Sequence, residues 1–162
     1  MIFNWNETVD KDDTVYILGD FVWKTGKITD YCKQLKGHKI LILGNHDRLT
    51  GPDRRFFDEI HDYGLEIKDN GFNVIMSHYP MLSYNKDYLD TSIHLFGHVH
   101  NNTKESQVVQ EIFTNLRKTY SGIPDNRCQA INVGCMMPWM DYIPRTINYL
   151  VNKLDRGEIY ET

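Results

Sequence analysis

The chain has 162 residues, of which 41% are hydrophobic and 25% are charged, and its formal net charge is −4. This composition is ordinary for a globular protein, and the length suits one domain with a sizeable core. The acidic balance disfavours an extended basic track along a nucleic-acid backbone, which counts against a nuclease. A nucleotide or the end of a nucleic-acid strand is still a possible ligand, because bound metal ions supply positive charge locally.

The three cysteines, Cys32, Cys128 and Cys135, are odd in number and show no C-x-x-C spacing. This pattern indicates reduced thiols in a protein of the cytoplasm. The start of the chain lacks the cationic and apolar regions of a signal peptide, and no apolar run approaches the roughly 18 residues that span a bilayer. We therefore expect a cytoplasmic protein without a membrane partner.

The first predicted strand covers Thr14–Leu18, and the next covers Lys39–Leu43. Between them, an amphipathic helix is predicted over Thr25–Leu35, with Gly37 placed to end it. The residues expected to face the core recur at helical spacing: Ile28, Tyr31, Cys32 and Leu35.

A second helix is predicted over Asp53–Tyr63, with four aromatic and aliphatic residues facing the core: Phe56, Phe57, Ile60 and Tyr63. Asn70-Gly71 is a strong turn signal between two strands, Leu65–Ile67 and Phe72–Met76, and predicts a hairpin.

Two later strands are predicted over Ser92–Phe96 and Gln129–Val133, and Thr146 is placed to cap a closing helix that runs to Leu154. Strands that alternate with helices, together with a hairpin, predict an α/β sandwich with mixed sheets flanked by helices. No repeat or linker divides the chain, so residues 1–162 are interpreted as a single domain.

Four short polar segments each follow directly after an apolar run. They are Gly19-Asp20, Gly44-Asn45-His46-Asp47, Ser77-His78-Tyr79-Pro80 and Gly97-His98-Val99-His100. Because open α/β sheets gather ligands at the carboxyl ends of their strands, we expect these side chains to meet. A set of carboxylate, amide and imidazole groups suits Mn²⁺, Fe²⁺, Co²⁺, Ni²⁺ or Zn²⁺ better than Mg²⁺ or Ca²⁺ alone. The pattern therefore indicates a metal-dependent hydrolase.

In their residues and in their order along the chain, the segments resemble the motifs of the calcineurin-like metallophosphoesterases. The pattern of that family is D-x-H, G-D-x-x, G-N-H-D/E, a lone histidine and G-H-x-H. The last four parts match, from about Trp5 to the end of the chain. Together they are highly specific, although a lone Gly-Asp would be weak. No Asp-x-His precedes Asp20, and Met1 lies in what resembles the helix after that motif. The resemblance thus implies one metallophosphoesterase domain over 1–162 that lacks its first strand and D-x-H segment.

In that family the first strand lies beside the strand that ends at Gly19-Asp20. Its loss is expected to leave rows of unpaired backbone groups. The sequence leaves open whether the chain closes this gap, forms a homodimer across it or is marginally stable.

The resemblance implies a centre of two divalent transition-metal ions (Mn, Fe, Ni, Co or Zn) with Asp20 as the bridging carboxylate. Asn45, His78 and His98 would complete the second ion's ligands, and His100 would bind the first ion. His98 and His100 are expected to face the centre together, as residues i and i+2 of a strand do. With only Asp20 and His100, the first ion should be held weakly or not at all. The alternative roles are a turn residue for Asp20, a loop-capping residue for Asn45, and hydrogen-bonded core residues for His78 and His98.

His46 resembles the family's catalytic histidine, which donates a hydrogen bond or proton to the phosphate or the leaving oxygen. Asp47 would orient the ring of His46 and favour its charged form. The alternative is that Asn-His-Asp is simply a polar loop. Nearby aromatic residues such as Trp23 and Tyr79 could line the pocket, although core or rim packing is the default interpretation.

Two functions follow from the resemblance. The first is hydrolysis of phosphate monoesters or, more strongly indicated, of phosphodiesters and nucleotides, with a small phosphate ester or nucleotide as substrate. The second is a catalytically impaired binding module or scaffold on the same fold, as in the retromer subunit that resembles these enzymes. The missing D-x-H favours the scaffold, and the intact His46 favours the enzyme.

Overall fold

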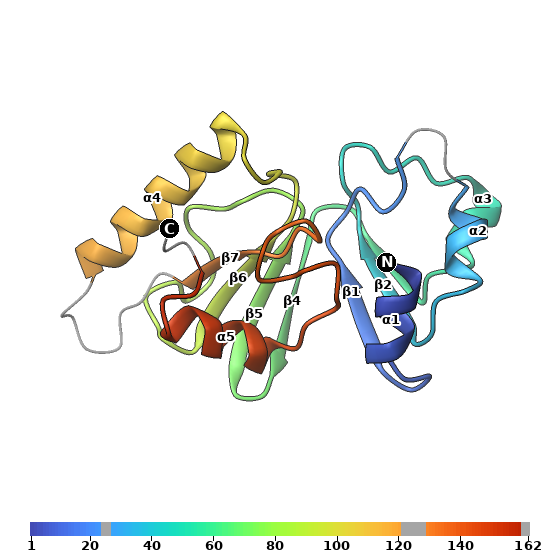
Figure 1. Ribbon diagram of the computed structural model, residues 1–162, viewed down its shortest axis with the longest axis horizontal. Coiled ribbons are helices and arrows are strands. Elements are labelled where there is room, and N and C mark those ends of the chain that lie inside the picture. The colour runs from blue at the N-terminus through green and yellow to red at the C-terminus, as the bar shows by residue number, and fades with distance from the viewer. Residues whose placement is uncertain (24–26, 121–128, 160–162) are drawn as a thin grey trace.

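The computed structural model describes residues 1–23, 27–120 and 129–159, and it contains two β-sheets with helices on their outer faces (Figure 1). The first sheet has the strand order β1-β2-β3, and all its pairings are parallel. The second has the order β4-β5-β6-β7, in which only the β4–β5 pair is antiparallel. The expected α/β fold with mixed sheets flanked by helices is confirmed.

The strands of the first sheet are β1 Thr14–Ile17, β2 His38–Ile42 and β3 Glu59–His61. Those of the second are β4 Gly64–Asp69, β5 Phe72–Ser77, β6 Ser92–Phe96 and β7 Gln129–Asn132. The helices are α1 Ile2–Thr8, α2 Ile28–Cys32, α3 Gly51–Arg54, α4 Lys104–Tyr120 and α5 Ile147–Asp155.

The core between the two sheets takes side chains from both of them. Ile42 of β2 belongs to the same buried cluster as Met76 of β5, Ile93 of β6 and Ile131 of β7. Helix α5 closes this core through Leu150, which is 2% exposed. Burial of each such aliphatic side chain contributes about 1.5–3 kcal/mol, so this shared core holds the two sheets together.

Helices cover the outer faces, because successive residues of a strand point to opposite sides of a sheet. Leu41, next to the inward-facing Ile42, packs on the outside against Ile28 and Cys32 of α2. In the second sheet, Phe96 packs on the outside against Phe113 of α4. The layers are therefore helix, sheet, sheet and helix, with the central strands buried on both faces.

Three local predictions are confirmed. Asn70 and Gly71 have φ angles of 47° and 85°, and they turn the chain between the antiparallel strands β4 and β5. The late strand forms as β7 and ends at Asn132, one residue earlier than expected. The hydroxyl of Thr146 accepts a hydrogen bond from the backbone of Tyr149 at 3.3 Å and caps α5.

The helix predicted over Thr25–Leu35 is shorter in the structure, where α2 has five described residues. Residues 24–26 lie outside the described part of the chain. Ile28 and Cys32 are buried as expected, but Tyr31 is 41% exposed, so one helical turn is too short to bury the whole predicted stripe. Gly37 has a left-handed φ of 78°, but it does not end the helix as predicted, because α2 ends at Cys32.

The helix predicted over Asp53–Tyr63 is wrong. Helix α3 ends at Arg54, and the chain continues as β3, which pairs in parallel with β2. The backbone of β2 offers unpaired hydrogen-bonding groups at that edge, and a strand satisfies them where a helix could not. Phe57 is still buried, whereas Tyr63 is 90% exposed.

Helix α4 was not predicted, although it is the longest helix of the described residues. Val109, Phe113 and Leu116 recur at helical spacing and pack on the second sheet, so the periodic signal was present in the sequence. No helix of the described residues is long and apolar enough to cross a membrane. Cys128 lies outside the described residues, and Cys32 and Cys135 are free thiols.

Strand β1 lies at an edge of the first sheet. Among the strands that the structure describes it pairs with β2 alone. This is the edge beside which the resemblance places a further strand, and at which the sequence leaves a homodimer open.

His94 of β6 is a fully buried structural histidine, not part of the polar segments. Its Nδ1 donates to the carbonyl of Ile75 at 3.1 Å, and its Nε2 accepts from the backbone N–H of Met81 at 3.0 Å. Burial lowers the pKa of His94 from 6.5 to about 4. The folded state therefore requires the neutral imidazole, which ties the segment after His78 to β6.

This burial makes stability depend on pH. Because the folded pKa lies below the unfolded one, the contribution of His94 is complete above about pH 6.5 and is lost as the pH falls toward 4, a loss of about 3 kcal/mol at most. We expect His94→Gln to lose less stability than the wild type between pH 7.5 and pH 4.5 in urea unfolding. His38→Gln, at an exposed position, is the control. An equal loss in His94→Gln and wild type would contradict this role.

Candidate metal centre

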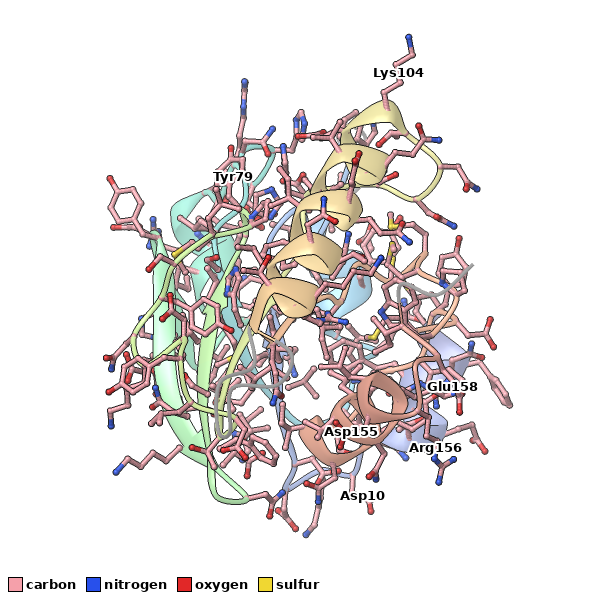
Figure 2. The ribbon with its side chains drawn as sticks, turned by 90° about the vertical axis from the view of Figure 1, so that its left-hand side faces the viewer. Asp10, Tyr79, Lys104, Asp155, Arg156 and Glu158 are labelled. Atoms are coloured by element: carbon pink, nitrogen blue, oxygen red, sulfur yellow. The ribbon has the colours of Figure 1, made fainter. Side chains whose placement is uncertain are left out.

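The four polar segments meet at one end of the two sheets. Asp20 follows β1, Asn45 follows β2, His78 follows β5 and His98 follows β6. Figure 2 shows Tyr79 at this end, opposite Asp10, which precedes β1. The sequence-based expectation that the polar residues gather at strand ends thus agrees with the structure.

Two glycines allow the loops after β1 and β2 to approach each other. Gly19 has a φ of 84°, and a Cβ there would lie 2.6 Å from the backbone nitrogen of Gly44. A Cβ on Gly44 would lie 2.6 Å from the backbone nitrogen of Asp20. Real Cβ atoms do not tolerate such distances, so the glycine before each ligand is required by this packing.

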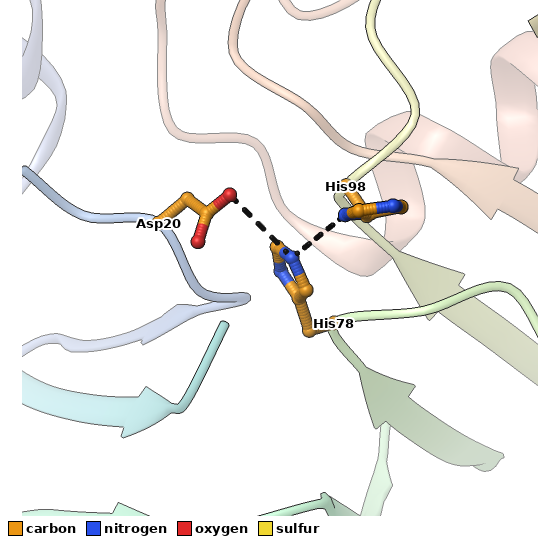
Figure 3. A group of neighbouring side chains, drawn as sticks. All are labelled: Asp20, His78 and His98. Atoms are coloured by element: carbon orange, nitrogen blue, oxygen red, sulfur yellow. Dashed lines mark hydrogen bonds and ion pairs between the residues drawn. The ribbon is translucent and has the colours of Figure 1, made fainter. Parts of the chain in front are cut away.

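Four electron-rich side-chain atoms converge between these loops. Asn45 Oδ1 lies 3.0 Å from His78 Nε2 and 3.1 Å from His98 Nδ1, and the two imidazole nitrogens are 3.1 Å apart. Asp20 Oδ2 lies 3.6 Å from His78 Nε2 (Figure 3). Ligand atoms of Asp20, His78 and His98 all lie within 4.8 Å of one another.

The protonation of His78 follows from its other nitrogen. Nδ1 lies 2.8 Å from the carbonyl oxygen of Leu18, which can only accept, so Nδ1 carries the hydrogen. In the neutral ring, Nε2 then presents a lone pair toward Asn45 Oδ1 and the Asp20 carboxylate. Facing lone pairs repel each other unless a proton, such as one on His98 Nδ1, or a cation lies between them. This donor set fits a transition-metal ion with mixed oxygen and nitrogen ligands.

The surroundings of the His98 imidazole also favour cation binding. Burial, and secondarily the neighbouring His78, lower the pKa of His98, although Glu105 and Asp20 oppose this shift. A neutral imidazole is the form that binds metal ions, so the environment favours the ligating state. His98 has a φ of 59°, an uncommon backbone conformation that turns its ring toward the cluster.

The role expected for Asp47 needs correction. Its carboxylate accepts hydrogen bonds from three backbone amides, those of Asp20 at 2.7 Å, Phe21 at 2.9 Å and Gly44 at 2.9 Å. Both carboxylate oxygens are therefore used to hold the loops after β1 and β2 together, not to orient His46. A short acidic side chain next to two tight turns satisfies amides that would otherwise lie unpaired in a half-buried loop.

His46 lies beside the cluster rather than in it. Its backbone N–H donates to Asp20 Oδ1 at 2.8 Å, and its ring lies 4.3 Å from that of Trp23. A cavity of about 220 Å³ opens next to the cluster, lined by Asp20, Trp23, His46, His98, His100, Thr103 and Glu105. The structure thus places His46 where it can reach a ligand in this cavity.

His100 does not stand where the sequence predicted. His98, Val99 and His100 follow β6 as an irregular loop, so the alternation of a strand does not apply. Val99 is buried and His100 is exposed, and the close ligand group of the described residues does not include His100. His100 still lines the cavity next to Asp20.

Glu105 and Thr103 also line the cavity. The sequence motifs did not predict either residue. They lie at the start of α4, which the sequence analysis did not predict. The signal was the pair Thr103-x-x-Ser106, in which each side chain bonds the backbone N–H of the other residue.

No family model matches this sequence. The chain is 27% identical over 165 residues to the uncharacterized protein MJ1445 of Methanocaldococcus jannaschii, covering 100% of this chain and 77% of that one. It is 27% identical over 183 residues to the gene 66 protein of Mycobacterium phage D29, covering 94% and 82%. The crystal structure of AQ665, a protein of unknown function from Aquifex aeolicus, superimposes with a TM-score of 0.65 at 26% identity, covering 94% and 82%. The fold is thus shared with AQ665, whose description names no activity.

We expect the purified protein to retain about one equivalent of Mn²⁺, Co²⁺ or Ni²⁺ after dialysis, because four ligands converge on one point. His78→Ala should lose most of this metal, since it removes the most deeply buried ligand. His38→Ala, at an exposed position outside the site, is the control. Elemental analysis measures the ratio of metal to protein. Absence of metal from the wild type, even after addition of these ions, would overturn the assignment of the site.

Replacing Asp47 with asparagine should loosen the site without touching a ligand. The neutral amide retains one acceptor oxygen for three backbone donors, so we expect a stability loss of about 2 kcal/mol and a weaker affinity for metal. Asp62→Asn, at an exposed position, controls for the charge change. Urea unfolding and metal titration measure the two effects. Unchanged stability with lowered turnover would instead support the role first expected, in which Asp47 acts on His46.

Proposed function

We propose that this protein is a metal-dependent phosphoesterase of the calcineurin-like metallophosphoesterase type. The observation that carries the proposal is the convergence of Asp20, Asn45, His78 and His98 on one point at the ends of four strands. The motif order of the sequence assigns these same four side chains to one metal ion. The order of the motifs and the interatomic distances therefore indicate the same four residues.

The layered architecture supports the finer part of the proposal, a metallophosphoesterase-type sandwich. Two sheets share a buried core, and helices lie on both outer faces. The site lies where the strands of both sheets end, with Asp20 and Asn45 from the first sheet and His78 and His98 from the second.

The size of the cavity is evidence for a small substrate. Its volume of about 220 Å³ suits a phosphate ester or part of a nucleotide rather than a long polymer. The net charge of −4 agrees with this, because no broad basic surface is required to hold one phosphate beside a metal ion. We propose phosphodiesters and nucleotides as the substrate class, with phosphate monoesters as weaker substrates.

Different residues of the chain would have different roles in hydrolysis. Asp20, Asn45, His78 and His98 would hold the metal ion, and a bound transition metal supplies Lewis acidity toward a phosphoryl oxygen. His46 would donate a proton or hydrogen bond to the leaving oxygen. The bond from its backbone to Asp20 couples the position of this acid to that of the metal ligand.

The proposed centre has one well-formed ion site. His100, which lines the same cavity as Asp20, remains the proposed ligand of a second ion. Two side chains alone would hold that ion weakly, since catalytic metal sites usually have three or more protein ligands.

His46→Ala should lower turnover by about two to four powers of ten while metal content stays the same, because His46 acts on the leaving group rather than on the metal. The assay uses bis-p-nitrophenyl phosphate with excess Mn²⁺, and elemental analysis runs in parallel. His61→Ala, which lies outside the cavity, is the control. Equal loss of metal and activity would make His46 a ligand, and unchanged turnover would remove it from the mechanism.

The second candidate is a binding module or scaffold on the same fold. The exposed His100, which stands outside the close ligand group of the described residues, favours it. Stable binding of one metal ion without turnover of any phosphate ester would support this candidate over the enzyme.

A further inference from the structure

The two ring nitrogens of His98 face different partners. Nδ1 lies 3.1 Å from both Asn45 Oδ1 and His78 Nε2, inside the cluster. Nε2 lies 3.9 Å from Oε1 of Glu105, on the other side of the ring. One nitrogen thus faces the proposed metal ion, and the other faces a carboxylate that belongs to none of the four polar segments.

His78 shows the same arrangement with the nitrogens exchanged. Its Nε2 faces the cluster, and its Nδ1 donates to the carbonyl of Leu18. For His78 the outer acceptor is a backbone group and the ring is 2% exposed, so its tautomer is fixed by the fold itself. For His98 the group that faces the outer nitrogen is a side chain, the carboxylate of Glu105 at 3.9 Å.

Glu105 is held at the rim of the cavity by the start of α4. Thr103 and Ser106 bond each other's backbone N–H groups at 3.0 Å, and the hydroxyl of Thr103 donates to the carbonyl of His100 at 3.1 Å. These bonds join the first turn of α4 to the loop that carries His98. A carboxylate in the first turn of a 17-residue helix is also favoured by the helix dipole.

We propose that Glu105 is a positioning residue of the metal centre: it accepts a hydrogen bond from Nε2–H of His98 and thereby turns the lone pair of Nδ1 toward the cation. The separation of 3.9 Å is longer than a hydrogen bond. The Glu105 side chain is 60% exposed, so a rotation toward His98 would close the gap.

This arrangement has a defined energetic effect. A carboxylate behind a ligating histidine fixes the tautomer and raises the basicity of the nitrogen that binds the metal. Removal of such a partner typically weakens metal affinity by about 10- to 100-fold. The inference rests on the proposed metal centre and not on the reaction that the centre performs.

The test compares Glu105→Ala and Glu105→Gln with matched controls at Glu111, which lies exposed on the same helix. Affinity for Mn²⁺ and Co²⁺ is measured by competition with a chromophoric chelator. Glu105→Ala should weaken affinity by about 10- to 100-fold. Glu105→Gln, which keeps an acceptor oxygen but loses the charge, should weaken it less. Glu111→Ala and Glu111→Gln should stay within about twofold of the wild type, which is within the usual effect of an exposed substitution.

A second measurement reads the tautomer directly. Nitrogen-15 spectra of the imidazole groups in the metal-free protein, assigned with His98→Asn, should show His98 protonated at Nε2 in the wild type. In Glu105→Ala they should show a mixture of the two neutral forms. A purely structural role for Glu105 would leave this ratio unchanged.

The outcomes separate this inference from the proposed function. Wild-type protein that binds metal, combined with a Glu105→Ala variant that matches Glu111→Ala in affinity and tautomer, would overturn the role of Glu105 alone. Wild-type protein that binds no metal would overturn both. Metal binding without hydrolysis would overturn the phosphoesterase, while the affinity comparison would still decide the role of Glu105.

Discussion

The hydrogen bond from His78 Nδ1 to the carbonyl of Leu18 joins the two sheets at the end where the site lies. It connects the end of β5 to the end of β1 across a sequence separation of 60 residues. The same bond leaves Nε2 as a lone pair that faces Asp20 and Asn45. One interaction thus contributes to the spacing of the sheets at this end and determines which nitrogen of His78 faces the proposed metal site.

The loops around this bond are also held by groups other than the four proposed ligands. Asp47 bonds three amides in the turns after β1 and β2, and the glycines at 19 and 44 let these turns touch. Because these contacts help to maintain the loop shape, the four proposed ligand side chains can present electron pairs inward. Such division between positioning groups and ligand groups is typical of metal centres.

Much of the fold could be predicted from local patterns. The hairpin at Asn70-Gly71 and the helix capped by Thr146 formed as expected, because each depends on residues close in the sequence. The helix predicted over Asp53–Tyr63 failed, because the open edge of β2 recruited Glu59–His61 as a strand. Apolar spacing could not reveal that competition, since short runs of this kind are compatible with either structure.

The sequence by itself determined which residue types stand at the strand ends, and so the kind of site: one carboxylate, one amide and imidazoles after apolar runs. Only the tertiary structure decided how these residues are used. It directed Asp47 to backbone amides, left His100 exposed in a loop and brought Glu105 of α4 beside His98. The reason is physical: a motif specifies side chains a few residues apart, whereas each of these outcomes depends on where distant loops pack and on which polar groups that packing leaves to be paired.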